Sequence, residues 1–114
     1  MNFILHPDLK KANMLFEKGL SQEAFDILNS YECDNPDDPN LYMRRAYFYA
    51  MNKEKNKAIA EVSRAIDLGR EEPSDYLFRG NEYQSIKEHL MAIKDYNKII
   101  FSLICIFSIC QFLI

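Results

Sequence analysis

The sequence overlays on itself when it is shifted by 34 residues, and this period constrains the fold more than any other feature. Small residues recur at one position of the period, and large residues recur three positions later. In the second half of each period, an alanine recurs and a bulky residue recurs four positions after it. The matched sets are Ala12, Ala46 and Gly80; Leu15, Tyr49 and Tyr83; Ala24, Ala58 and Ala92; and Leu28, Val62 and Tyr96. A period of about 20 to 50 residues is typical of a solenoid, in which each unit leaves an apolar face that its neighbour covers.

The order of small and large positions within each period predicts two packed helices. Residues three or four apart lie on one face of a helix, so Ala46 and Tyr49 share a face of a first helix. Ala58 and Val62 share a face of a second helix in the same way. Small side chains let two helix backbones approach closely, while large ones fill the space between repeats. Each period is therefore expected to fold as an antiparallel helical hairpin.

Prolines, glycines and a serine mark the ends of the expected helices. Pro39 and Pro73 suit the first turn of a helix, where the missing N–H removes no hydrogen bond. Ser21 is expected to cap the helix that follows it, and Gly69 to end a helix in the left-handed conformation. No segment alternates with a period of two, so we expect no β-sheet. The expected helices cover residues about 7–18, 22–32, 40–52, 55–68, 74–86 and 89–100.

In this period and these positions the chain resembles the tetratricopeptide repeat (TPR) family, whose repeat is about 34 residues long. Tyr42 and Tyr76 match the aromatic residue that the family places before the small residue of the first helix, and Asp8 departs from it. Ala65 matches a small residue late in the second helix. The resemblance implies an all-α fold, a short right-handed solenoid of about three antiparallel helical hairpins. The expected array covers residues 5–98, in repeats 5–38, 39–72 and 73–98, and an apolar tail covers 99–114.

Composition and charge argue against nucleic-acid binding. The 114 residues carry a formal net charge of −3, with lysines and glutamates mixed along the chain. The basic run at 53–57 is interrupted by Glu54 and falls at an expected hairpin turn, so it is interpreted as a solvated loop. We expect one domain and no nucleic-acid partner.

Signals for catalysis, metals and cofactors are nearly absent from the sequence. The three cysteines lack Cys-x-x-Cys spacing, and their odd number does not suit a disulfide framework, which favours a reducing compartment. The two histidines have no second ligand three or four residues away. The acidic stretch 32–38 lacks the glycine and the closing glutamate of an EF-hand loop. We expect a cytoplasmic protein that is not an enzyme, binds no cofactor and carries no secretory signal.

The resemblance also implies a binding surface. In the TPR family, the first helices of successive repeats line a concave groove that holds an extended peptide. The corresponding positions here combine apolar, amide and charged side chains, which suits peptide recognition. The expected groove residues are Lys10, Asn13, Met43, Arg44, Tyr47, Phe78, Asn81 and Gln84, with Leu9, Phe16, Glu17, Met51 and Leu77 as further candidates. For Phe16, Met51 and Phe78, packing between neighbouring helices is the alternative.

A narrower hypothesis within the family finds little support. Family members that bind the acidic C-terminal tails of heat-shock chaperones carry two lysines, two asparagines and an arginine at fixed groove positions. Asn13 matches one of these positions, and only Lys10 and Arg44 could replace part of the missing charge. The other four positions hold Leu9, Arg44, Ser74 and Phe78. The sequence therefore does not favour a chaperone tail as the partner.

The segment Ile99–Ile114 carries no charged residue. As a helix it would extend about 24 Å at about 1.5 Å per residue, short of the roughly 30 Å of a hydrocarbon core. Lys94 and Lys98 would keep the repeats on the cytoplasmic side if the segment inserted. Three interpretations remain open: a membrane anchor, a truncated or mistranslated end of a longer repeat, and a helix buried against a partner.

These observations predict a protein-interaction adaptor that binds a protein or peptide partner in the groove of a TPR-like array. The alternative is a structural component that associates with a membrane through Ile99–Ile114.

Overall fold

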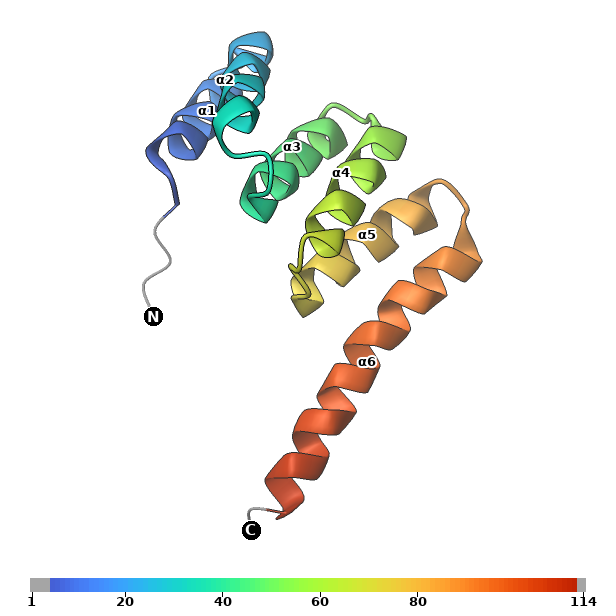
Figure 1. The fold of residues 1–114 in the computed structure, drawn as a ribbon. Coiled ribbons are helices and arrows are strands. Elements are labelled where there is room, and N and C mark those ends of the chain that lie inside the picture. The colour runs from blue at the N-terminus through green and yellow to red at the C-terminus, as the bar shows by residue number, and fades with distance from the viewer. Residues whose placement is uncertain (1–4, 113–114) are drawn as a thin grey trace. The chain divides into compact units, whose positions relative to one another are not determined.

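The computed structural model describes residues 5–112, which form helices joined by short turns and contain no strand (Figure 1). The helices are α1 (Pro7–Glu17), α2 (Ser21–Asp34), α3 (Pro39–Met51), α4 (Lys55–Asp67), α5 (Pro73–Ser85) and α6 (His89–Phe112). They pack as consecutive pairs, α1 with α2, α3 with α4 and α5 with α6. The predicted all-α fold of helical hairpins is thus confirmed. The chain divides into two compact units, the first ending at Gly69 and the second beginning at Arg70.

The first unit, α1 to α4, has a core built from the repeated small and large positions. Ala12, Ala46, Ala24 and Ala58 are each 0% exposed, so the helix backbones approach closely at these alanines. The two hairpins are joined by contacts of α3 with both α1 and α2. Aromatic rings fill this junction: Phe16, Phe25, Phe48 and Tyr49 form a cluster of stacked, edge-on and tilted pairs. The larger buried side chains are Leu9, Leu28, Leu41, Met43 and Val62.

The second unit is the α5–α6 hairpin. Gly80 occupies the small position of α5, and a Cβ added there would lie 2.7 Å from a ring carbon of Tyr96 on α6. On α6, Ala92 is 0% exposed. Arg79 on α5 donates two hydrogen bonds to the buried Asp95 on α6, at 2.8 and 2.7 Å. Close backbone approach and the Arg79–Asp95 ion pair therefore help to hold this hairpin together.

The turn inside each hairpin repeats in atomic detail at the period of the sequence. The residue at positive φ is Gly19 (86°), Lys53 (64°) and Lys87 (66°) in the three turns. The next residue donates its N–H to a carbonyl five positions back, at 2.9 Å in every case: Leu20 to Leu15, Glu54 to Tyr49 and Glu88 to Tyr83. This is the left-handed helix ending of the Schellman type. The basic run at 53–57 falls partly in such a turn, as expected.

Three of the six helices begin with proline, namely α1, α3 and α5. The N-cap of α3 is Asp38, which accepts hydrogen bonds from the N–H of Asn40 and from the hydroxyl of Tyr31. Burial and this bond to Asp38 raise the pKa of Tyr31 to about 12. Gly69 follows α4 with a φ of 102°, as the sequence predicted.

One predicted cap is wrong. Ser21 is the first residue of α2, and the N-cap is Leu20, whose side chain accepts no hydrogen bond. The reason is the shortness of the turn: the N–H of Leu20 still closes the end of α1 by bonding to Leu15. The next helix therefore begins at once, without a separate capping residue.

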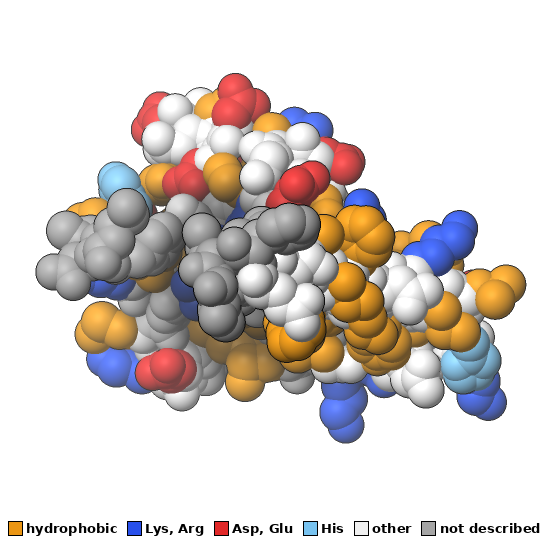
Figure 2. All heavy atoms as spheres, turned by 90° about the horizontal axis from the view of Figure 1, so that it is seen from below, with side chains coloured by type: hydrophobic (Ala, Val, Ile, Leu, Met, Phe, Trp, Pro, Cys, Tyr) orange, Lys and Arg blue, Asp and Glu red, His pale blue; other side chains and the backbone are white. Residues whose placement is uncertain are grey.

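The last helix is longer than predicted, since α6 continues past residue 100 to Phe112. Its second half carries large hydrophobic side chains that are mostly exposed, for example Phe101 (69%), Leu103 (61%) and Phe107 (64%). Figure 2 shows hydrophobic side chains gathered along α6. No helix within residues 5–112 combines the length and the apolar character needed to cross a membrane. The end of the predicted tail, residues 113–114, lies outside the described residues.

Candidate functional site

A hollow of about 410 Å³ lies between α1 and α3 in the first unit. Asn13, Phe16 and Glu17 contribute to it from α1, and Arg44, Tyr47, Phe48 and Met51 contribute from α3. We call it the α1–α3 hollow. Two of its lining residues, Phe16 and Phe48, stack their rings, whose centroids lie 4.2 Å apart with planes 3° from parallel. Because α1 and α3 are the first helices of their hairpins, the hollow lies where the resemblance places a binding groove.

The hollow brings together six of the predicted groove positions: Asn13, Arg44 and Tyr47, and the further candidates Phe16, Glu17 and Met51. Asn13 lies on α1, and Arg44 and Tyr47 lie one turn apart on α3. The Arg44 guanidinium lies 5.8 Å from the centroid of the Tyr47 ring, within range of a cation–π contact. Lys10 is exposed on α1, about one turn before Asn13, and does not line the hollow. The site therefore combines an amide, a guanidinium and aromatic faces.

Two groove candidates are core residues. Met43 is 2% exposed and Leu9 is 1% exposed, so neither can contact a bound peptide in this structure. They are 34 residues apart and occupy the same position of the first helix in their repeats. Helix packing covers this position in both repeats, so both side chains are buried. The prediction of Met43 as an exposed groove residue is therefore corrected.

Phe78, Asn81 and Gln84 lie on α5 in the second unit. Gln84 is exposed and Phe78 is partly buried. The side-chain oxygen of Asn81 accepts a hydrogen bond of 2.7 Å from the hydroxyl of Tyr96 on α6. Asn81 thus contributes to its own hairpin. A role of these three residues in binding stays a prediction.

A second hollow of the first unit, about 350 Å³, has a different character. It is lined by Ser21, Gln22, Phe25, Asn29, Tyr49, Asn52 and Glu54, from α2 and the region around the α3–α4 turn. None of the predicted groove residues lies there. Hydroxyl and amide groups dominate this lining, whereas the α1–α3 hollow presents aromatic and thioether side chains beside its polar groups.

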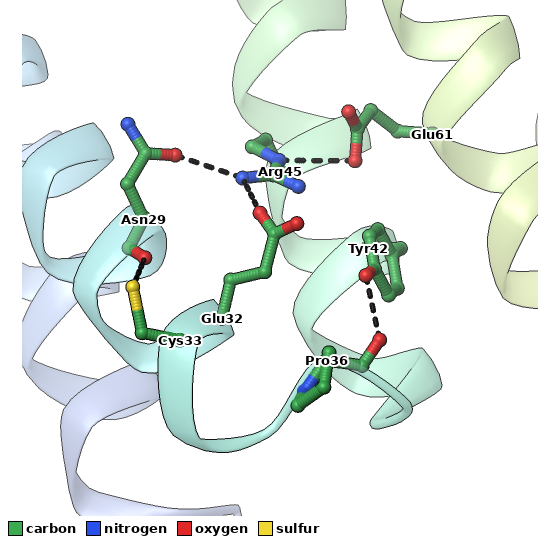
Figure 3. Close-up of polar contacts among 7 residues, drawn as sticks. All are labelled: Asn29, Glu32, Cys33, Pro36, Tyr42, Arg45 and Glu61. Carbon is green, nitrogen blue, oxygen red and sulfur yellow. Dashed lines mark hydrogen bonds and ion pairs between the residues drawn. The ribbon is translucent and has the colours of Figure 1, made fainter.

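An ion-pair network that was not predicted from the sequence connects the two hairpins of the first unit. Figure 3 shows Arg45 of α3 between Asn29 and Glu32 of α2 and Glu61 of α4. The guanidinium donates to Asn29 at 2.8 Å and to Glu61 at 3.0 Å, and it lies 2.8 Å from Glu32. The hydroxyl of Tyr42 nearby donates to the carbonyl of Pro36 at 2.6 Å. Arg45 therefore ties three helices together and positions α3, which carries half of the hollow.

A signal for this network was present in the period. Arg45 and Arg79 are 34 residues apart, as are their acidic partners Glu61 and Asp95. Each arginine also lies over a tyrosine three residues earlier, Arg45 at 5.5 Å from the ring centroid of Tyr42 and Arg79 at 5.6 Å from that of Tyr76. The 34-residue repeat of these charged residues therefore indicates both pairs.

Burial and ion pairing shift the pKa values of this network in opposite ways. Burial raises the pKa of Glu61, an effect that the Arg45 guanidinium partly opposes. Burial alone would lower the pKa of Arg45, but its bonds to Glu32 and Glu61 raise it. Hydrogen bonds to Asp95 raise the pKa of Arg79. Both arginines are therefore fixed cations with a structural role.

The described part of the chain contains no group of three His, Cys, Asp or Glu side chains placed to hold a metal ion. Cys33 and Cys105 are exposed free thiols.

Comparison with known proteins supports the fold. No family model and no curated protein matches the sequence. Among solved structures, the chain is similar to the second TPR domain of Spaghetti (RPAP3), solved bound to the HSP90 peptide SRMEEVD. The TM-score is 0.73 at 17% sequence identity, over 82% of this chain and 87% of that one. Together with the repeated hairpins, turns and ion pairs, this likeness shows that the chain has the tetratricopeptide repeat fold.

Proposed function

We propose that the chain is a non-enzymatic interaction module that binds a peptide segment of a partner protein in the α1–α3 hollow. The observation that carries the proposal is the hollow itself, formed between the first helices of two hairpins and lined by Asn13, Arg44 and Tyr47. The similar TPR domain of Spaghetti was solved with a peptide bound, which supports the same kind of ligand here.

The chemistry of the hollow indicates the features of the peptide. Arg44 can pair with a carboxylate, and Asn13 can hydrogen-bond the peptide backbone. Tyr47, Phe16 and Met51 offer a polarisable apolar surface, and Met51 is 72% exposed at its edge. We therefore propose an extended segment with one apolar anchor and an acidic group beside it.

The test begins with a peptide library displayed on phage and selected on the full chain. The enriched peptides are synthesised, and their Kd is measured by fluorescence anisotropy. We expect Arg44→Ala and Asn13→Ala each to weaken binding by about tenfold or more, the range of a hydrogen bond to a charged group or a comparable contact. Matched controls are Arg64→Ala and Asn56→Ala, which change the same residue types at exposed positions of α4.

The melting temperature of each variant separates lost binding from lost folding. Selected peptides that bind Arg44→Ala and Asn13→Ala as tightly as the parent chain would place the binding site elsewhere and refute the proposal. The peptide SRMEEVD is a useful specificity probe in the same assay. We expect it to bind poorly, because the buried Leu9 and the residues Ser74 and Phe78 replace polar groups of a chaperone-tail clamp.

A further inference from the structure

The helix α6 carries a stripe of exposed residues with the spacing of a coiled coil. Successive members are three and four residues apart in strict alternation: Leu90, Ile93, Asn97, Ile100, Ile104, Phe107 and Gln111. Every one of them is exposed, including Leu90 at 77%, Ile93 at 50%, Ile100 at 53% and Ile104 at 57%. An alternating spacing of three and four corresponds to the a and d positions of a heptad repeat, which form the contact between supercoiled helices. We call these seven residues the α6 seam.

The seam is separate from the face of α6 that packs on α5. The hairpin contact uses Ala92, Asp95 and Tyr96, of which Asp95 binds Arg79 and Tyr96 closes over Gly80. These residues fall between the seam positions in the heptad, on another side of the helix. The α6 helix can therefore present the seam to a further helix while it remains paired with α5.

We propose that α6 binds α6 of a second copy of the chain, parallel and in register, through the seam. An apolar seam is removed from water when it packs against a helix with a matching apolar stripe. The α6 helix of a second copy of the chain supplies such a stripe by symmetry. The residues from Ile99 onward carry no charge, so two copies meet along this length without like-charge repulsion.

Asn97 favours a parallel over an antiparallel orientation of the two α6 helices. In a parallel, in-register pair, Asn97 lies opposite Asn97 of the other copy, and the two amides can hydrogen-bond each other. In an antiparallel pair over the same span, Asn97 would lie opposite Ile104, and Leu90 opposite Gln111. Each of these contacts would bury an amide against an apolar side chain without a partner, which costs free energy. The parallel arrangement is therefore favoured.

The exposed area is large enough for a stable pair. From their exposed fractions, the apolar seam residues and the flanking Phe101 and Leu103 expose on the order of 800 Å² per helix, similar to one side of a standard protein interface. Aromatic residues such as Phe101 and Phe107 contribute strongly to interface energetics.

The experiment compares two neighbouring isoleucines of equal exposure. Ile104 lies in the seam at 57% exposed, and Ile106 lies outside it at 58% exposed. Two residues rotate a helix by about 200°, so the two side chains face different directions. Particle mass is measured by sedimentation equilibrium for the full chain and for the variants Ile104→Glu and Ile106→Glu. We expect a parent chain of at least two copies per particle, an Ile104→Glu monomer with self-association weakened at least 100-fold, and an Ile106→Glu variant that associates like the parent.

A monomeric parent chain, or equal effects of the two substitutions, would overturn the proposal. Equal effects together with binding of the parent to phosphatidylcholine vesicles would indicate a lipid surface as the occupant of α6 instead.

Disulfide trapping tests the parallel register independently. In a background with Cys33, Cys105 and Cys110 replaced by serine, Ile100→Cys places identical seam positions opposite each other, so mild oxidation should give a covalent dimer. Ile106→Cys in the same background should remain monomeric on a non-reducing gel. Equal cross-linking at both positions would indicate non-specific aggregation and would refute the seam.

Discussion

At the scale of single residues, the three hairpin turns use one backbone geometry but different residues. Gly19 adopts its positive φ freely, whereas Lys53 and Lys87 hold angles of 64° and 66° against the preference of L-residues. The 2.9 Å bond from Glu54 to Tyr49 keeps Lys53 in this conformation. The turn geometry is thus imposed by the packing of the two helices, and the lysine carries strain.

Replacing Lys53 by glycine should therefore stabilise the protein. Relief of the left-handed strain, about 1–2 kcal/mol, exceeds the added entropy of glycine in the unfolded chain, about 0.4–1 kcal/mol. We expect the free energy of unfolding to rise by roughly 0.5–1 kcal/mol in urea titrations. The matched control is Lys11→Gly in the middle of α1, which should lower stability by about 1 kcal/mol. A loss of stability in Lys53→Gly would contradict the strained turn.

The ion pair of Arg45 and Glu61 gives a prediction with a defined pH dependence. Arg45→Ala leaves the carboxylate of Glu61, whose side chain is only 20% exposed, without its cation. We expect a loss of about 2–4 kcal/mol at pH 7, the range for removing one partner of a buried charged pair. Because burial already raises the pKa of Glu61, loss of Arg45 should raise it further.

When the pKa of a carboxyl group is higher in the folded state than in the unfolded state, the protein loses stability as the pH rises from the unfolded pKa through the folded pKa. The loss in free energy of unfolding that Arg45→Ala causes should therefore be smaller below the unfolded-state glutamate pKa of about 4.3, and it should grow toward pH 7. Urea unfolding at pH 4 and pH 7 measures it, with Arg64→Ala as the control for losing an arginine. A deficit that is the same at both pH values would show that Glu61 does not respond to Arg45.

At the scale of the secondary-structure elements, each hairpin depends on an alanine or glycine where its helices meet. Ala58 on α4 is 0% exposed in the α3–α4 hairpin, whereas Ala60 on the same helix is exposed. The first position has no room for a larger side chain, and the second faces solvent.

The substitution Ala58→Trp should therefore destabilise the α3–α4 hairpin by about 1–3 kcal/mol or more through overpacking. Ala60→Trp, with the same change of side chain on the same helix, should alter stability by no more than about 0.5 kcal/mol. Thermal melts followed by circular dichroism compare the two variants. Equal melting temperatures for Ala58→Trp and the parent chain would mean that the repeat register is misassigned.

At the scale of the whole molecule, the two proposed binding surfaces lie in different units. The α1–α3 hollow belongs to the unit that ends at Gly69, and the α6 seam belongs to the unit that begins at Arg70. Two chains paired through the seam would carry two hollows in one particle. Such a particle would bind a partner with two copies of the peptide segment more tightly than either hollow alone, because the second binding event becomes intramolecular.

The amino-acid sequence by itself determined the hairpins, because the 34-residue spacing of small and large side chains is local information about which helix faces can pack. It also placed Asn13, Arg44 and Tyr47 on the helices that form the α1–α3 hollow. Only the tertiary structure showed that Met43 is buried in the core. It also showed that Arg45, two residues later, links α3 to α2 and α4. The physical reason is that a position's exposure and charge partners depend on which helix covers it. Spacing along one helix does not specify that neighbour.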